Sequence, residues 1–272
     1  MTANAAGGRE ALISIRDVSV AFGDRRVLER VSLDVYRGET VALLGGSGSG
    51  KTTLLRQVIG LARPDSGRIV IGGVDLTSCS EAELAAVRRR IGVAFQESAL
   101  FSSLSVEENA ALPLHELTGL AEPIINLMVW MKLKAVGLAD AAKLYPRELS
   151  GGMKKRAAIA RAIALDPDIV VLDEPSAGLD PIIAAGLDEL IVLLKRGFGM
   201  TVLVVTHALE SAFRIADRVA MLYHGSLVAV GTPEEFKAAT HARVRQFVEG
   251  QPERLDDASE GFAASFLKEF QP

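Results

Sequence analysis

The stretch Gly45-Gly46-Ser47-Gly48-Ser49-Gly50-Lys51-Thr52 decides the fold of this chain. It matches G-x-x-x-x-G-K-[ST], the pattern of a phosphate-binding loop. The apolar run at residues 41–44 predicts a buried strand before it, and the helical spacing of apolar residues between 54 and 59 predicts a helix after it. A strand, a glycine-rich loop and a helix in this order predict an α/β fold built around a phosphate site.

The residue types in this loop suit a nucleotide. Glycines let the backbone curl so that successive N–H groups point at one anion, and the helix that follows adds its positive dipole end. We expect Lys51 to reach the β- and γ-phosphates and Thr52 to hold Mg²⁺, with Thr53 beside them. The alternative is a Gly/Ser-rich surface turn, but a chance turn has no reason to place Lys51-Thr52 on a first helical turn behind a buried strand.

Composition narrows the class of protein. The chain has 272 residues, 49% hydrophobic and 24% charged, which is enough for a sizeable buried core. No apolar run approaches the roughly 20 residues that span a bilayer, so we expect neither a membrane span nor export. A single cysteine, Cys79, excludes internal disulfides, and a net charge of −4 argues against a dedicated nucleic-acid binder.

Two carboxylates follow a second buried strand. The apolar run at residues 169–172 ends on Asp173-Glu174-Pro175. A carboxylate at the end of a buried strand is costly without a partner. Mg²⁺ would supply one for Asp173 and leave Glu174 to orient and deprotonate a water molecule, whereas the simpler alternative is an ordinary charge pair between strand and loop.

A third buried strand, at residues 201–205, ends at Thr206-His207. If the sheet is parallel and these strands are neighbours, His207 lies at the same sheet edge as the phosphate loop. The other histidines, His115, His224 and His241, show no spacing that suggests metal binding.

The flanking segments have different patterns. Alternating apolar residues between 13 and 22 and between 31 and 35 predict half-buried antiparallel strands. Between 97 and 157 no strand is evident, and Ser105 with Glu108 caps a helix, so this segment is interpreted as an all-helical insertion. Its predicted packing stripe has helical spacing and comprises Ile124, Leu127, Met128 and Met131, together with Trp130.

A further motif, Leu-Ser-Gly-Gly-Met, occupies residues 149–153. The motifs follow one another along the chain in this order: the phosphate loop, Gln96, Leu-Ser-Gly-Gly-Met, Asp173-Glu174, Asp180 and His207. With these motifs the chain resembles the ATP-binding subunit of an ABC transporter over residues 11–247. The resemblance implies a P-loop NTPase core of the RecA-like kind, with an N-terminal antiparallel β subdomain and a helical subdomain inserted at 97–157. It also implies ATP hydrolysis coupled to transmembrane transport, with ATP and Mg²⁺ as cofactors.

The resemblance also implies how the motifs act. In the family two copies form a head-to-tail homodimer, and Ser150, Gly151 and Gly152 meet the γ-phosphate of the ATP that the other copy holds. A helix beginning there offers N–H groups and a positive dipole end to that anion. By the same likeness, Phe22 stacks on adenine, Gln96 senses Mg²⁺ and the attacking water, Asp173 and Thr52 hold Mg²⁺, Glu174 is the general base, His207 holds the γ-phosphate, and Asp180 belongs to the nucleotide site.

Met153 narrows the resemblance, because most relatives have glutamine there and a thioether cannot donate a hydrogen bond. With residues 95–101, 108–114, 131–138, 149–167 and 243–250, the chain resembles the Mla, or Mce-associated, branch. Those ATPases power phospholipid movement between the bacterial inner and outer membranes. The likeness implies a peripheral position on the cytoplasmic face of the inner membrane. Implied partners are an integral-membrane permease of the MlaE type that docks on the helical insertion, an MCE lipid-binding protein of the MlaD type and, left open, a STAS-domain subunit of the MlaB type.

The sequence does not decide between the phospholipid-transport function and two others, and it leaves the role of the C-terminal tail open. The chain could serve another importer or exporter, for example of amino acids or drugs, or it could be a soluble ABC ATPase that acts on DNA or ribosomes. The tail at 251–272 carries Phe262, Phe266 and Phe270, whose spacing predicts a docking helix. Such a helix could lie on its own body, on a partner subunit or on a membrane surface.

Overall fold

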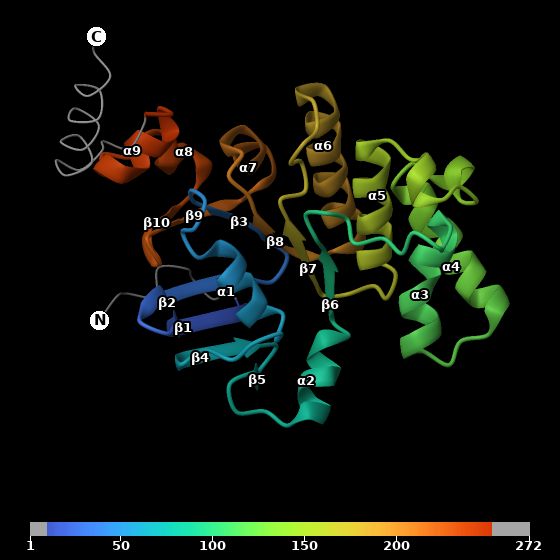
Figure 1. The fold of residues 1–272 in the computed structure, drawn as a ribbon, viewed down its shortest axis with the longest axis horizontal. Helices are drawn as coiled ribbons and strands as arrows, with labels where there is room; N and C mark the ends of the chain where they lie inside the picture. The colour runs from blue at the N-terminus through green and yellow to red at the C-terminus, as the bar shows by residue number, and fades with distance from the viewer. Residues whose placement is uncertain (1–9, 252–272) are drawn as a thin grey trace, which may run out of the picture.

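The computed structural model describes residues 10–251, so the tail helix predicted beyond them lies outside the described residues. Within this range the strands form an antiparallel sheet, β2-β1-β4-β5, and a mainly parallel core sheet, β10-β9-β3-β8-β7-β6 (Figure 1). The predicted α/β fold with an antiparallel N-terminal subdomain is therefore confirmed. The antiparallel sheet consists of β1 (Ala11–Phe22), β2 (Arg25–Tyr36), β4 (Ser66–Ile71) and β5 (Val74–Asp75). The core sheet consists of β3 (Thr40–Leu44), β6 (Ile91–Ala94), β7 (Ile169–Asp173), β8 (Thr201–Val205), β9 (Arg218–Tyr223) and β10 (Ser226–Gly231).

Helices connect these strands, and several begin where the sequence predicts a cap. Ser105 forms the predicted capping box with Glu108, and Ser80 and Thr232 form the same motif with a glutamate three residues later. The helices are α1 (Lys51–Val58), α2 (Glu81–Arg88), α3 (Val106–Leu117), α4 (Glu122–Ala135), α5 (Gly151–Ala162), α6 (Pro181–Phe198), α7 (Leu209–Ile215), α8 (Pro233–Lys237) and α9 (Ala242–Val248), with short 3-10 turns η1 (Ala139–Ala141) and η2 (Pro146–Glu148). Among residues 10–251, none of them has the length and apolar character needed to cross a bilayer.

The core sheet is buried on both faces, because successive residues of its strands point to opposite layers. In β3, Val41 and Leu43 pack with α1 and the antiparallel sheet. The alternate residues, Ala42 and Leu44, pack with α7, α8 and α9. Figure 1 shows α1 and the antiparallel sheet on one side of the core sheet and α5, α6 and α7 on the other. Burial from two sides explains why the core strands appear in the sequence as continuous apolar runs.

The helical segment lies between β6 and β7 as expected, but the predicted packing stripe on α4 is wrong except for Met128, which packs against the core of the insertion. Ile125, Val129 and Leu133 are buried in the core of the insertion. The residues of the predicted stripe that are instead about half exposed are Ile124, Leu127, Trp130 and Met131. This helix is apolar on two adjacent faces, so helical spacing alone cannot tell which one packs.

The end of the helical segment is continuous with the core. The expected limit at residue 157 falls inside α5, and this helix contacts both α3 and β6. A Cβ added at Gly92 in β6 would lie 2.0 Å from the carbonyl oxygen of Ala162 in α5. Glycine is therefore required at residue 92 for α5 to approach the sheet this closely.

A pair of alanine substitutions on α4 tests which face packs. Leu133→Ala is expected to lower the free energy of unfolding by about 2 to 5 kcal/mol, since it leaves a cavity in the core of the insertion. Leu127→Ala, the matched control on the exposed face, is expected to change it by about 0.5 kcal/mol or less. Urea unfolding followed by circular dichroism measures both. Equal losses from the two variants would contradict the assigned faces.

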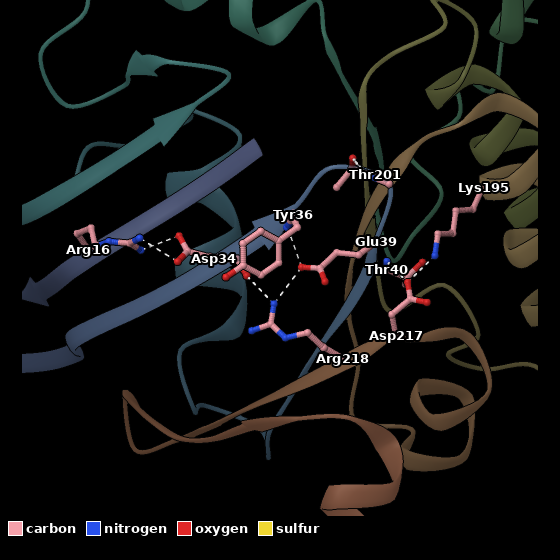
Figure 2. A network of polar contacts seen from close by, with 10 residues as sticks. Arg16, Asp34, Tyr36, Glu39, Thr40, Lys195, Thr201, Asp217 and Arg218 are labelled. Carbon is pink, nitrogen blue, oxygen red and sulfur yellow. Dashed lines mark hydrogen bonds and ion pairs between the residues drawn. The ribbon is translucent and has the colours of Figure 1, made fainter. Parts of the chain in front are cut away.

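A network of polar contacts joins the two sheets at the edge opposite the phosphate loop (Figure 2). Glu39, which is only 4% exposed, accepts hydrogen bonds through Oε1 from the N–H of Tyr36 at 2.7 Å and from Arg218 Nη1 at 3.0 Å. Asp217 Oδ2 accepts from the N–H of Thr40 at 2.6 Å and also contacts Lys195. The end of β2 is thereby fixed to the starts of β3 and β9.

Replacing Glu39 by glutamine is expected to change how stability depends on pH. Burial raises the pKa of the Glu39 carboxyl above its ordinary value, against the opposing effects of the Tyr36 N–H and Arg218. The folded state therefore holds this proton more tightly than the unfolded state does. The stabilisation that comes from binding this proton is complete below the ordinary pKa of glutamate, and it is lost as the pH rises through the pKa of Glu39 in the folded state.

Urea unfolding of the wild type and Glu39→Gln at about pH 5 and about pH 7.5 measures this effect. The free energy of unfolding of the wild type minus that of the variant should be larger at the lower pH. A difference that does not change with pH would show that Glu39 ionises alike in both states.

Candidate functional site

Part of the predicted site gathers at one edge of the core sheet, because β3, β8, β7 and β6 are parallel neighbours: the phosphate loop, Gln96, Asp173, Glu174 and His207. The condition set for His207 is therefore met. Asp173 ends β7 and pairs with Val205, the last residue of β8, while Leu43 of β3 pairs with the other side of Val205. Three segments therefore leave the sheet at the same level: the loop after β3, the carboxylates after β7 and His207 after β8. Together they form a row along the sheet edge, and Gln96, which follows β6, lies at its outer end.

The phosphate loop has a backbone that only glycine accommodates at two positions. Gly45 has φ 154°, and a Cβ there would lie 2.4 Å from the carbonyl oxygen of Leu222. Gly50 has φ 104°, and a Cβ there would lie 2.7 Å from the Leu28 side chain. Gly46, Ser47, Gly48 and Ser49 lie between them, and α1 begins at Lys51, followed by Thr52 and Thr53. This geometry agrees with a phosphate cradle at the start of a helix.

Lys51 is held inside this loop. Its Nζ donates to the carbonyl oxygens of Gly45 at 2.7 Å and Gly46 at 2.9 Å. Burial lowers the pKa of Lys51, and the negative charges of Glu174 and Asp173 act in the opposite direction. The ammonium group is thus positioned beside the loop and close to both carboxylates.

Glu174 is the most constrained residue of the site. It is a non-glycine residue with φ 47°, in the left-handed region where strain concentrates at functional sites. Its Oε2 accepts from Thr206 Oγ1 at 3.1 Å and from the N–H of His207 at 3.4 Å. Its Oε1 lies 2.8 Å from His207 Nδ1. The Glu174 side chain is 11% exposed.

Asp173 has the character of a cation ligand. It is 9% exposed, and among residues 10–251 its carboxylate has neither a hydrogen-bond donor nor an ion-pair partner. Burial raises the pKa of Asp173 and the neighbouring Glu174 raises it further, against Lys51 and Lys155. A hard divalent cation prefers such a carboxylate together with hydroxyl, phosphate and water oxygens. Asp173 and the hydroxyl of Thr52 therefore fit Mg²⁺ bound with a nucleotide, although within the described chain no three His, Cys, Asp or Glu residues group to hold a metal by themselves.

The Ser150 motif starts α5, as expected. The Ser150 side chain caps the helix by accepting from the N–H of Met153 at 3.3 Å. A Cβ at Gly152 would lie 2.8 Å from Ile183 of α6. Met153 packs against the apolar core of the helical insertion, which accounts for an apolar residue there. In Figure 1, α5 and α1 lie on different sides of β7 and β8, so within one copy this motif does not join the phosphate loop.

Asp180 and Phe22 lie at element ends, Asp180 at the start of α6 and Phe22 at the end of β1. The Asp180 carboxylate caps α6 by accepting from the N–H groups of Ile182 and Ile183 at 3.1 and 3.0 Å. The Phe22 side chain is exposed, with 63% of its surface accessible.

A cavity of about 360 Å³ adjoins the phosphate loop. It is lined by Gly46 to Ser49, by Arg25 at the start of β2, and by Tyr223 and Arg243 among others. The Arg243 guanidinium lies 4.9 Å from the centre of the Tyr223 ring. The phosphate loop thus borders open space on this side.

Sequence reasoning missed two residues of the site. Thr206 is fully buried, and its hydroxyl donates to Glu174 while accepting from the N–H of Ala208 at 3.0 Å. Lys155 is buried on α5, and its Nζ donates to the carbonyl oxygens of Gln96 and Glu174. A sequence signal existed for Lys155, because it shares a helical face with the apolar residues Ala158, Ile159 and Ala162.

Comparison with known proteins decides the family. The family model described as ABC transporter matches residues 28–177, more than half of the chain. The chain belongs to the ABC transporter family. It is the ATP-hydrolysing subunit of a transporter, as the nucleotide site indicates.

Among curated relatives, the chain is 45% identical over 239 residues to the intermembrane phospholipid transport system ATP-binding protein MlaF of Escherichia coli K12, covering 88% of this chain and 89% of the relative. It is 42% identical over 239 residues to the probable ribonucleotide transport ATP-binding protein mkl of Mycobacterium tuberculosis H37Rv, covering 88% of this chain and 67% of the relative. The likeness to an MlaF-type ATP-binding protein is thereby confirmed.

Solved structures agree on the fold and on nucleotide binding. A dimeric post-hydrolysis state of the ATP-binding cassette MJ0796 bound to ADP and Pi matches with a TM-score of 0.74 at 30% identity, over 81% of this chain and 98% of the other. Clostridium perfringens cbiO1, part of the transporter complex cbiONQ, matches with a TM-score of 0.79 at 29% identity, over 87% and 95%. Cassettes of this ABC ATPase fold form dimers.

Two substitutions separate binding from chemistry at this site. Glu174→Gln is expected to slow ATP hydrolysis by about 10²- to 10⁴-fold while leaving ATP binding intact, because it removes a proton acceptor but keeps the shape. The closed dimer should then accumulate with ATP. Lys51→Ala is expected to abolish tight nucleotide binding instead. Steady-state hydrolysis and equilibrium binding of ATP measure both, and hydrolysis at the wild-type rate in Glu174→Gln would refute the assignment of the base.

Proposed function

We propose that this ABC ATPase powers phospholipid transport between the inner and outer membranes of a bacterium, maintaining the lipid asymmetry of the outer membrane. The observation that carries the proposal is the 45% identity to MlaF over nearly the whole length of both chains. Met153 in place of the usual glutamine supports the same branch, since its packing against the insertion core accommodates an apolar residue there.

The proposed working form is a homodimer with two nucleotide sites. Each site combines the phosphate loop of one copy with Ser150, Gly151 and Gly152 of the other. The separation of these motifs within one copy supports this arrangement (Figure 1). The start of α5 is exposed at Ser150 and Gly151, so its N–H groups are accessible to the γ-phosphate of an ATP molecule from outside the chain.

In this site Glu174 is the proposed general base. His207 and Thr206 orient its carboxylate from β8, and Gln96 approaches the attacking water from the end of β6. Mg²⁺, held by Thr52 and Asp173 with Gln96 nearby, would neutralise phosphate charge. Phe22 stacks on adenine, Lys51 neutralises the phosphates, His207 contacts the γ-phosphate once ATP is bound, and Asp180 borders the nucleotide from the start of α6.

The proposed partners are an integral-membrane permease, an MCE lipid-binding protein in the same complex and a STAS-domain subunit, with this chain on the cytoplasmic face of the inner membrane. The helical insertion is the proposed docking region for the permease. The half-exposed Ile124, Leu127, Trp130 and Met131 on α4 support a protein partner there, because contiguous apolar side chains on a surface favour burial by another subunit.

A second candidate is ribonucleotide transport, which the printed name of the mycobacterial mkl relative suggests for that protein. The chain covers only 67% of that relative but 89% of MlaF, and its identity to MlaF is higher. Phospholipid transport is therefore the better-supported substrate class.

Reconstitution with the cognate permease and MCE protein tests the substrate. Vesicles containing fluorescently labelled phospholipid should show lipid movement that requires ATP. The matched complex carrying Glu174→Gln should bind ATP but move lipid at least about 10²-fold more slowly. ATP-dependent transport of a radiolabelled ribonucleotide without any lipid movement would overturn the proposal in favour of the second candidate.

A further inference from the structure

Lys155 is a buried cation that lies between three functional segments. It sits on α5, five residues after the capping Ser150, and is 9% exposed. Its Nζ donates to the carbonyl oxygen of Gln96 and, at 3.1 Å, to that of Glu174. Among residues 10–251 it has no ion-pair partner. Burying a charge in this way is costly, so the two carbonyl contacts must offset much of that cost.

Both carbonyl groups belong to residues of the hydrolytic site. Gln96 is where the chain leaves β6 for the helical insertion, and Glu174 is where it leaves β7 in the left-handed conformation. The Glu174 carbonyl also accepts from the N–H of Ala177 at 3.2 Å. These two carbonyl groups lie outside the hydrogen-bonded ladder of the sheet, so they need donors from elsewhere. The Lys155 ammonium group donates to each of them.

The electrostatic surroundings agree with this role. Burial lowers the pKa of Lys155, while the negative charges of Glu97, Glu174 and Asp173 oppose that effect. The Lys155 cation therefore lies in the electric field of the Glu174 and Asp173 carboxylates, but its hydrogen bonds go to backbone carbonyls. It can thus hold the backbone of Glu174 without forming an ion pair that would neutralise the Glu174 carboxylate.

We propose that Lys155 is a positioning residue that fixes the backbone of Gln96 and Glu174 to α5. Ser150 and Lys155 lie on the same helix, which moves as one rigid unit. Contact of Ser150 with the nucleotide of a second copy therefore sets the position of Lys155, and Lys155 in turn sets the position of Glu174, the general base of the chain's own site. The two nucleotide sites of a dimer would thereby be linked through one side chain. This inference rests on the roles proposed above for Glu174 and Ser150.

Three variants of the full-length chain test the positioning role. Lys155→Met keeps the apolar stem but removes the donor, and it should lower kcat for ATP by about 10- to 100-fold with KM and ATP affinity changed by less than about threefold. Lys155→Arg keeps the charge and the donors and should restore most of kcat. Lys154→Met is the matched control, the same substitution one residue earlier at a half-buried position, and its side chain makes no hydrogen bond within residues 10–251. This variant should keep the wild-type kcat.

A double-mutant cycle separates positioning from a merely structural role. In the Glu174→Gln background, Lys155→Met should cause little further loss of hydrolysis, because the group that Lys155 positions is already absent. Losses that multiply in the double variant, or a loss of ATP affinity as large as the loss of kcat, would overturn the proposal. If Lys155→Met does not fold, as judged by thermal unfolding, Lys155→Gln enters the same cycle. Normal hydrolysis in Glu174→Gln alone would instead refute the base assignment, so the two failures are distinguishable.

Discussion

The position of β8 between β3 and β7 is the constraint on which the site depends. The hydrogen-bonded ladder continues one residue past the ends of these strands: the N–H of Glu174 donates to the carbonyl of Val205 at 2.8 Å, and that of Thr206 to the carbonyl of Leu43 at 3.1 Å. Three segments that are far apart in sequence are thereby fixed at one level. A shift of one residue in the β7–β8 pairing would turn Glu174 away from His207, since successive side chains of a strand point to opposite faces.

Around this row the protein gathers two buried cations and two buried carboxylates. Burial lowers the pKa of Lys51 and of Lys155 and raises that of Asp173. The cations bond to backbone carbonyls rather than to the carboxylates, so Asp173 stays available as a ligand and Glu174 as a proton acceptor. The site is thus electrically balanced as a group while each carboxylate remains chemically accessible.

Much of the fold and of the site could be predicted from the sequence, because the deciding features are local. A glycine-rich loop, an apolar run ending in carboxylates and a capping serine each act over a few residues, and the structure places them as expected. The face of α4 could not be predicted, because Ile125 and Leu127 both fit a helical stripe and only packing against α3 and α5 selects one. Lys155 shares a helical face with apolar residues, but its role could not be predicted, because its carbonyl partners Gln96 and Glu174 are far from it in sequence and only the tertiary fold brings them together.

The Phe22 platform and the phosphate loop belong to sheets that share no strand in the described chain. In the binding mode proposed above, with adenine on Phe22 and the phosphates in the loop, a bound nucleotide would contact both sheets. The Glu39 network holds the two sheets together at the opposite end (Figure 2). Under that proposal, hydrolysis would change the contacts at the phosphate end only, and the base would keep its place on Phe22.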